Sequence, residues 1–340
     1  MNCFFSRNYK DPGSAGNKAK ADIESILLGM GFTNIGNRST NYPGEPKAFL
    51  ATLASVLKAV SNLSGGDVLV VQYPLKKYFS FVCRAAHRKG AKVIALIHDL
   101  GSFRRKALTP DKEIARLSNA DYIIAHNDSM RQWLISKGMR KPVGTLGIFD
   151  YLSGSQNNTA SEAVRPYRVI YAGNLSRRKN AFLYNVGKNI RSYRLKLYGR
   201  GFDSESAEGK DNFETMGFVD SDKLIATVQG DFGLVWDGDS TEGCTGDFGE
   251  YLQYNNPHKT SLYLRCCLPV ILWKKAALAP FVEENRIGIC IGSLGELNDV
   301  LDSLSPEEYA EMKNNASRMA TLLQNGHFTS KAVGEALAAL

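Results

Sequence analysis

The stretch NNPHKTSLYLRCCLPVI, residues 255–271, predicts a helix that leads into a buried apolar strand. We expect Asn256 to cap this helix and Pro257 to be its first residue, because proline has a preset φ and loses nothing there by lacking an N–H. His258 and Lys259 then fall in the first turn, where a cation opposes the helix dipole at a cost of about 0.3 to 1 kcal/mol. A phosphate held by Lys259 and by backbone N–H groups would turn this cost into a net stabilisation. A solvated lysine at a surface helix start is the alternative.

A second group of cations stands in the sequence GNLSRRKN, residues 173–180. An apolar strand ends here, and Arg177, Arg178 and Lys179 precede a helix that we expect to be capped near Asn180. As in the first stretch, cations stand at an expected helix start, where the helix dipole disfavours them. This half of the chain is acidic overall, so a general excess of basic residues does not explain them. A diphosphate bound between the two groups would explain both.

Short apolar runs alternate with helical periodicity along the chain, which predicts βα units around parallel sheets. The expected strands form two groups, near residues 1–6, 67–73, 91–98 and 121–125, and near residues 167–172, 193–198, 231–236, 269–273 and 288–291. The segment between the groups is rich in Ser, Asn and Thr and is typical of a linker. We therefore predict four parts: an N-terminal domain (1–150), a linker (151–166), a C-terminal domain (167–320) and a final helix (321–340) that packs back on the N-terminal domain.

Ligands of open α/β sheets bind at the carboxyl ends of the strands, so polar residues that follow a strand are the first candidates for a site. His98 and Asp99 follow one expected strand, and His126 follows the next. Asp99 is our candidate for a general base and His98 is the close alternative, while a turn or capping role for Asp99 stays open. A loop with Gly13 and Gly16 follows the first strand and is expected at the same edge. It lacks the GxGxxG spacing of a nicotinamide or flavin site.

The composition is that of a soluble globular protein large enough for two domains, with 340 residues, of which 44% are apolar and 22% charged. The six cysteines form no CxxC pair and no Cys/His cluster, so a structural metal is not expected. No apolar run reaches the roughly 20 residues that cross a bilayer, and the first residues lack a secretory signal. We therefore expect a cytoplasmic protein.

The charge is distributed unevenly between the two halves. Residues 1–165 contain 23 Lys/Arg and 12 Asp/Glu, a balance of +11, whereas residues 166–340 contain 19 and 22, a balance of −3. A basic half is attracted to anionic surfaces such as the inner face of a membrane, although an ordinary solvated surface is the alternative. Interleaved aromatic residues and a known nucleic-acid motif are lacking, so nucleic acid is not an expected partner.

At these residues the chain resembles the two-domain nucleotide-sugar glycosyltransferases of the GT-B architecture. The sequence from Gly173 is similar to the GRLxxxKG signature of their donor domain, and NPHKTSLYLRCCLPVI resembles their segment ending in xGxPVI. With GLVWDGD, IHDL and YAGNLSRRKN, the chain also resembles a bacterial group that contains the glucosyltransferase of serine-rich-repeat adhesins and β-1,6-galactofuranosyltransferases. This resemblance implies an α/β fold with two Rossmann-like domains facing a central cleft.

The resemblance further implies a homo-oligomeric enzyme that transfers a hexose, glucose or galactofuranose, from a UDP-sugar to a glycan or glycoprotein acceptor. The UDP-sugar is the donor substrate, and no cofactor or metal is implied because lysine and arginine would neutralise the diphosphate. The implied donor site consists of Asn174, Arg177, Arg178, Lys179, Phe218, Val219, Asn256, His258 and Lys259. Phe218 and Val219 are the candidates for uracil, although a core position for Phe218 is the more ordinary expectation. The acceptor side is assigned to Gly13, Gly16 and His126, and the carboxylates of Asp237 and Asp239 are candidates to hold sugar hydroxyls.

Two positions depart from the family pattern. Leu262 stands where many relatives have a glutamate that holds the ribose, and Cys267 replaces the glycine of xGxPVI. Two rival functions stay open on the sequence alone. One is a UDP-sugar epimerase of the same architecture, and the other is a non-enzymatic protein that binds nucleic acid or another anion.

Overall fold

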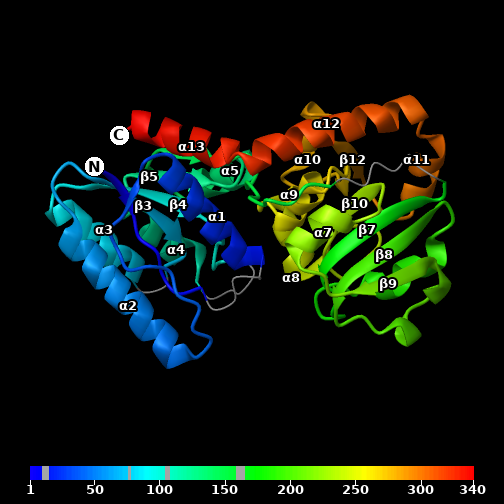
Figure 1. Ribbon diagram of the computed structural model, residues 1–340, viewed down its shortest axis with the longest axis horizontal. Helices are drawn as coiled ribbons and strands as arrows, with labels where there is room; N and C mark the ends of the chain where they lie inside the picture. Colours follow the sequence, from blue (N-terminus) through cyan, green and yellow to red (C-terminus); the bar gives the residue numbers. More distant parts are fainter. Residues whose placement is uncertain (10–14, 76–77, 104–107, 158–164) are drawn as a thin grey trace. The chain divides into compact units, whose positions relative to one another are not determined.

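The computed structural model describes residues 1–9, 15–75, 78–103, 108–157 and 165–340. The chain divides into two compact units, unit 1 (Met1–Asp150 and Gly326–Leu340) and unit 2 (Tyr151–Asn325) (Figure 1). Each unit is built around one six-stranded sheet in which the paired strands run parallel, as the alternating βα pattern predicts. Among the described residues, no helix is both long and apolar enough to cross a membrane.

The sheet of unit 1 has the strand order β2-β1-β3-β4-β5-β6. Its strands are β1 (Asn2–Phe4), β2 (Thr33–Asn34), β3 (Val68–Tyr73), β4 (Lys92–Ile97), β5 (Tyr122–Ala125) and β6 (Val143–Thr145). The two central strands β3 and β4 pair along their whole length and are almost continuously apolar, because helices cover both faces of the sheet. The short strands β2 and β6 were not predicted from the sequence, because so few residues show no clear hydrophobic periodicity.

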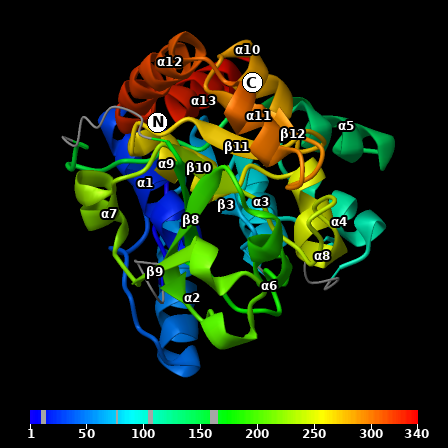
Figure 2. The ribbon, with the colours of Figure 1, turned by 90° about the vertical axis from the view of Figure 1, so that its right-hand side faces the viewer.

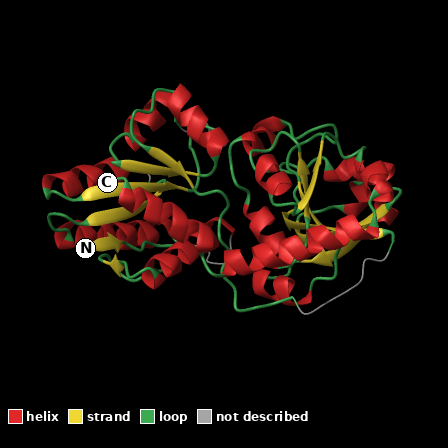
Figure 3. Ribbon diagram, turned by 90° about the horizontal axis from the view of Figure 1, so that it is seen from above, coloured by secondary structure: helices red, strands yellow, loops and turns green. Residues whose placement is uncertain are grey.

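Alternate residues of the unit 1 strands supply two separate cores, one on each face of the sheet. Leu69 and Val71 belong to one core, and Val70 and Ile94 to the other. Helices lie on both faces of the sheet, red around the yellow strands in Figure 3. The first core includes residues of α2 (Glu45–Asn62), α3 (Phe79–Arg88), α4 (Pro110–Leu117) and α5 (Asp128–Ser136), and the second includes residues of α1 (Ala15–Gly29) and α13 (His327–Ala338).

The C-terminal segment consists of two helices that belong to different units. The first, α12 (Pro306–Gln324), packs against α9 (His258–Arg265) in unit 2. The chain then turns at Gly326, whose φ of +69° suits glycine, into α13. The carboxylate of Asp150 accepts hydrogen bonds from the backbone N–H groups of Phe328 (3.2 Å) and Thr329 (2.6 Å). Asp150 thereby caps the start of α13 and ties it to unit 1.

The sheet of unit 2 has the order β12-β11-β10-β7-β8-β9 (Figure 2). Its strands are β7 (Tyr167–Asn174), β8 (Tyr193–Arg200), β9 (Phe213–Gly217), β10 (Phe232–Val235), β11 (Val270–Trp273) and β12 (Gly288–Ile291). Its remaining helices are α6 (Leu183–Val186), α7 (Ser221–Thr227), α8 (Gly246–Gly249), α10 (Ala279–Glu284) and α11 (Leu297–Ser303), with short 3-10 turns at Gly187–Asn189, Ser204–Ser206, Lys210–Asn212 and Glu250–Gln253. The edge strand β9 was missed from the sequence because most of its residues are exposed and its apolar pattern is weak.

Candidate functional site

The residues singled out in the two cationic stretches meet at the carboxyl ends of β7 and β10, which are neighbours in the unit 2 sheet. β7 ends at Gly173 and Asn174, and β10 leads into Trp236 and Asp237. Gly173 has a φ of +135°, and a Cβ placed on it would lie 3.5 Å from Cε of Lys259. The two stretches, which are more than eighty residues apart in the chain, are therefore in contact.

The anion that balances Lys259 in this structure is the carboxylate of Asp237. The Lys259 ammonium donates to Oδ1 of Asp237 at 2.8 Å and to the hydroxyl of Tyr171 at 2.5 Å. Nζ also lies 3.9 Å from the centroid of the Tyr171 ring. The side chains of Lys259 and Asp237 are only 12% and 11% exposed, so Lys259 is not a solvated surface lysine. Asp237, which the sequence suggested as a ligand of sugar hydroxyls, here faces lysine.

A second lysine approaches the same carboxylate. Nζ of Lys179 lies 3.5 Å from Oδ1 of Asp237, so two ammonium groups share one carboxylate oxygen. We call Lys179, Lys259, Asp237 and Tyr171 the lysine centre. With two cations and one anion, it has a formal excess of one positive charge at the carboxyl edge of the sheet.

The pKa values in the lysine centre are set by burial and by the close charges. Burial lowers the pKa of Lys259 to about 8, against the opposing pull of Asp237. Burial alone would raise the pKa of Asp237, but the charges of Lys259 and Lys179 outweigh it and hold that pKa below its ordinary value. Asp237 is therefore ionised at neutral pH, and Lys259 is protonated there and loses its proton in mildly alkaline solution.

The structure corrects the helix that was expected after the cations at 177–179. α6 begins only at Leu183 and has four residues, so no long helix directs its dipole at this site. Asn180 does not cap it by its side chain. Instead Asn180 is buried, accepts from the Tyr171 hydroxyl at 2.7 Å and donates to the carbonyl of Asn174 at 2.5 Å. Asn180 thus fixes the loop that carries the cations against the end of β7.

The other members of this loop point in different directions. The Asn174 side chain accepts from the N–H of Ser176 at 2.8 Å and shapes the turn. The guanidinium of Arg177 lies 4.9 Å from the centroid of the Tyr184 ring. Arg177 and Arg178 are both exposed, so either guanidinium can meet a ligand in solvent.

The start of α9 also differs slightly from the expectation. The helix begins at His258, and Pro257 precedes it with an extended backbone (ψ 131°), so the N-cap is Pro257 and not Asn256. Asn256 is buried, and the His258 ring lies 6.4 Å from that of Tyr151. The placement of Lys259 in the first turn is unchanged by this one-residue shift.

The expectation of a core position for Phe218 is wrong. Its side chain is 60% exposed just beyond β9, next to the partly buried Val219. The guanidinium of Arg200, at the end of β8, lies 4.7 Å from the centroid of the Phe218 ring. Sequence reasoning missed Arg200, whose only signal was its position at the end of a strand.

In unit 1, the two histidines at strand ends pack on one aromatic ring. His98 stacks on Phe149 with centroids 5.5 Å apart, and its Nε2 lies 2.6 Å from Oε1 of Gln72. His126 is buried and meets the same ring edge-on at 4.9 Å. This packing holds both rings at the edge where the acceptor side was predicted.

The loop that carries Asp99 is anchored by a buried carboxylate that the sequence did not reveal. Glu113 of α4 is fully buried and accepts from the N–H groups of Gly101 (3.0 Å) and Ser102 (2.7 Å). It also accepts from the hydroxyl of Tyr73 at 2.7 Å. Glu113 therefore holds the backbone of residues 101 and 102, just after Asp99.

A further polar cluster follows β1 in unit 1. Glu24 accepts from the hydroxyls of Ser6 (2.6 Å) and Tyr9, and burial raises its pKa above the ordinary value. Gly16 lies exposed in the first turn of α1, whereas Gly13 lies outside the described residues. Within the described part of the chain, no group of three or more His, Cys, Asp or Glu side chains is arranged as a metal site.

The two departures from the family pattern lie within α9 and just after its end. Cys267, which replaces a family glycine, has a φ of +56° and follows the end of the helix. The N–H groups of Cys267 and Leu268 bond to the carbonyls of Leu264 (2.8 Å) and Tyr263 (2.9 Å). This is the pattern of a Schellman motif, in which glycine is favoured because a Cβ is strained at positive φ. Leu262, the other departure, lies within the same helix.

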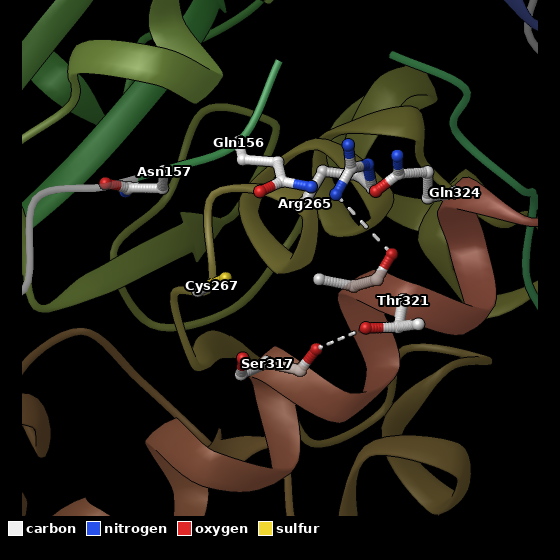
Figure 4. Close-up of a pocket in the computed structure, with 8 residues that line it drawn as sticks. Gln156, Asn157, Arg265, Cys267, Ser317, Thr321 and Gln324 are labelled. Atoms are coloured by element: carbon white, nitrogen blue, oxygen red, sulfur yellow. Dashed lines mark hydrogen bonds between the residues drawn. The ribbon is translucent and has the colours of Figure 1, made fainter. Parts of the chain in front are cut away.

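Figure 4 shows a polar pocket of about 210 Å³ between the end of α9 and α12. The buried Arg265 lines it, together with Cys267 and side chains of α12. Arg265 donates to the carbonyls of Tyr151 (3.1 Å), Ser153 (3.1 Å) and Ser155 (3.0 Å), and burial lowers its pKa. Its guanidinium thus holds residues 151–155 against the end of α9 and has a structural role.

Family models match both halves of the chain. The model "Glucosyltransferase 3-like, N-terminal domain" matches residues 2–148, and "Glucosyltransferase 3-like, C-terminal domain" matches residues 169–336. β-1,6-galactofuranosyltransferase WbbI of Escherichia coli K12 is 34% identical over 327 residues, which cover 95% of this chain and 93% of that protein. Glucosyltransferase 3 of Streptococcus gordonii is 22% identical, over 94% of this chain and 93% of that protein.

Solved structures of glycosyltransferases share the fold. Sucrose-phosphate synthase of Thermosynechococcus elongatus has a TM-score of 0.63 at 14% identity, covering 100% of this chain and 98% of that one. The lipopolysaccharide outer core galactosyltransferase WaaB has a TM-score of 0.61 at 11% identity, with 100% of both chains covered. An α-glucosyltransferase in complex with UDP and DNA has a TM-score of 0.54 at 11% identity, covering 99% and 98%. At these identities the likeness shows the fold alone, which is GT-B.

The sequence relatives decide between the functions that the sequence left open. They are glycosyltransferases, so neither the epimerase nor the non-enzymatic alternative is favoured. The chain belongs to the glucosyltransferase 3-like family and is a hexosyltransferase with the GT-B fold.

Proposed function

We propose that this hexosyltransferase uses UDP-galactofuranose as its donor and transfers the sugar to a hydroxyl of a glycan or glycoprotein. The observation that carries the proposal is the lysine centre, where Lys179 and Lys259 converge at the carboxyl ends of β7 and β10. Phosphates are bound by cations at this edge in open α/β sheets.

The charges of the lysine centre suit a diphosphate. Asp237 neutralises one of the two ammonium groups, and one positive charge is left for a ligand. Each charge-assisted contact contributes about 1.5 to 3 kcal/mol, so two of them exceed the dipole cost of about 0.3 to 1 kcal/mol at the α9 terminus. Arg178 is exposed beside Lys179 and supplies a third cation. These side chains would stabilise the UDP leaving group without a metal ion.

The remaining donor residues are those that the family resemblance implies. We assign the ribose and sugar hydroxyls to Asn174, the last residue of β7, and to Asn256 and His258 at the start of α9. Phe218 and Val219 are assigned to uracil, because an exposed ring beyond β9 offers a stacking face. Arg200 already lies over that ring and would stack on the base from the side of β8.

The transfer step needs a base for the acceptor hydroxyl. We assign it to Asp99, with His98 as the alternative, because Asp99 begins a loop that Glu113 holds in place. The base takes the hydroxyl proton as the acceptor oxygen attacks the anomeric carbon. The bond from that carbon to the diphosphate oxygen breaks, and UDP leaves with the electron pair.

The sugar is proposed from the relatives. The galactofuranosyltransferase is 34% identical to this chain, and glucosyltransferase 3 of S. gordonii is 22% identical. Glucose is accordingly the second candidate. The homo-oligomer that the resemblance implies stays a prediction.

The proposal is tested first by thermal shift with UDP, GDP and inorganic diphosphate. A ligand at a hundredfold its Kd stabilises the protein by about 2.7 kcal/mol, so UDP should shift the melting temperature clearly and more than GDP. Release of UDP is then measured with UDP-galactofuranose and with UDP-glucose. Faster release from UDP-glucose would replace the proposed sugar, and the absence of any UDP effect would contradict the donor class.

A matched pair of arginine variants tests the site itself. Arg178→Ala should weaken UDP binding about ten- to a hundredfold, since it removes one charge-assisted contact. Arg191→Ala is the control, because Arg191 lies before the amino end of β8 and pairs with Asp299 at 3.2 Å. Equal affinities for UDP in the two variants would show that Arg178 does not touch the donor.

A further inference from the structure

Two neighbouring helices of unit 1 expose large apolar side chains. On α2, Phe49, Leu50 and Leu57 are 44%, 60% and 51% exposed, and on α3 Phe81 is 41% exposed. α2 and α3 contact each other and cover the same face of the sheet (Figure 1). Their outward sides therefore form one continuous surface, which we call the α2–α3 face.

Three leucines of α2 form an apolar ridge along the helix, while Phe49 lies 6.0 Å from the ring of Tyr78. Leu50, Leu53 and Leu57 are spaced by three and four residues and lie on one side of the helix. The buried residues Val56 and Ala59 lie on the other side, against the core. A surface helix of a globular protein normally has a polar outer face, so an apolar ridge there marks an interaction surface.

The α2–α3 face is also basic. Exposed Lys47 and Lys58 flank the ridge on α2, and exposed Arg84 and Arg88 lie with Phe81 on the outer side of α3. Over the two helices, which are described completely, these four cations are opposed by one acidic residue, Glu45. Four Lys/Arg less one Glu give a balance of +3 on a surface with an apolar ridge.

We propose that the α2–α3 face docks this protein on an anionic lipid surface. Phe49, Leu50, Leu57 and Phe81 enter the headgroup region, and Lys47, Lys58, Arg84 and Arg88 meet the lipid phosphates. Apolar side chains flanked by Lys and Arg are the combination by which helices lie in the plane of a membrane. A second copy of the chain fits less well, because an isologous contact would bring two surfaces of +3 together. The proposal concerns recruitment to a surface and does not depend on the identity of the donor.

Sedimentation of the full chain with lipid vesicles tests this proposal. The protein should bind vesicles that contain phosphatidylglycerol, bind phosphatidylcholine vesicles weakly, and dissociate as salt rises from about 0.1 to 1 M, where the Debye length falls from roughly 10 to 3 Å. Leu50→Ser with Leu57→Ser should weaken binding at least about tenfold. Lys58→Gln should weaken it about fivefold, as expected for one basic residue at such a surface.

Matched variants on the opposite face of the sheet are the controls. Leu28 on α1 is 56% exposed, and Lys331 on α13 is exposed. Leu28→Ser and Lys331→Gln should leave vesicle binding unchanged, and Lys259→Ala in unit 2 should also bind vesicles like the wild type. Circular dichroism and the melting temperature confirm that each variant is folded.

Three results would overturn the proposal. The first is equal loss of binding in the control and α2–α3 variants, and the second is no binding to anionic vesicles at all. The third is a change of molar mass in light scattering when Leu50 and Leu57 are replaced, without a change in vesicle binding, which would make the face a contact between copies of the chain.

Discussion

The ion pair between Lys259 and Asp237 can have one of two roles, and mutations can distinguish them. It either belongs to a diphosphate site or only stabilises the fold. We consider the variant Lys259→Met, which keeps much of the apolar stem and removes the charge. Breaking a buried pair costs about 3 to 5 kcal/mol of stability, because the remaining charge is left buried. The lower end applies here, since Lys179 still lies 3.5 Å from the Asp237 carboxylate.

Donor binding should fall in the same variant. The lost contact is charge-assisted and contributes about 1.5 to 3 kcal/mol, so UDP affinity should fall from about tenfold to over a hundredfold. The double variant Lys259→Met with Asp237→Asn removes both charges and should regain most of the lost stability. It should not regain UDP affinity, because one cation of the site is still missing.

The single variant Asp237→Asn should have the opposite effect on UDP affinity. It leaves two ammonium groups without their carboxylate, so UDP should bind at least as tightly as to the wild type, although the fold is less stable. Isothermal titration calorimetry with UDP and urea denaturation measure the two effects separately. If the double variant recovers both stability and UDP affinity, the pair is only structural and the reasoning is refuted.

Three other predictions concern the base, the pH dependence and the departure at Cys267. Asp99→Asn should leave UDP affinity intact and slow transfer at least about a hundredfold in a UDP-release assay, and near-normal turnover would exclude Asp99 as the base. Because Lys259 has a lowered pKa of about 8 and binds an anion only when protonated, affinity for a UDP-hexose measured by calorimetry should be constant below about pH 7 and fall as the pH rises through 8. Affinity that stays flat up to about pH 9 would mean that Lys259 does not bind the diphosphate. Cys267→Gly should raise the urea midpoint, with a gain of about 0.5 to 1 kcal/mol, because glycine relieves the strain of a φ of +56°; a lower midpoint would contradict this account.

The sequence predicted the architecture well because its signals are local. The apolar runs at Val68–Tyr73 and Lys92–Ile97 are long and buried on both faces, and such runs can be read without knowledge of the rest of the chain. The short strands β2 and β6 and the exposed strand Phe213–Gly217 carry no such signal and were missed.

The site could be predicted only in part. The position of Lys259 in a first helical turn led us to predict a bound phosphate, which stays a prediction. The anion that pairs with Lys259 in this structure is Asp237, which lies 22 residues away and is placed by the sheet. The same limit applies to Asn180, which was read as a cap and turns inward to Tyr171, since only the fold brings that hydroxyl within reach. Phe218 was misjudged because residue type alone favours the core, whereas its exposure is decided by its position beyond an edge strand.

The most direct test of the central claim is a crystal structure of the protein with UDP bound. We predict diphosphate oxygens within about 2.7 to 3.2 Å of Nζ of Lys259 and of Lys179, at the carboxyl ends of β7 and β10. UDP bound elsewhere, with both lysines still directed only at Asp237, would contradict the assignment of the lysine centre as the donor site.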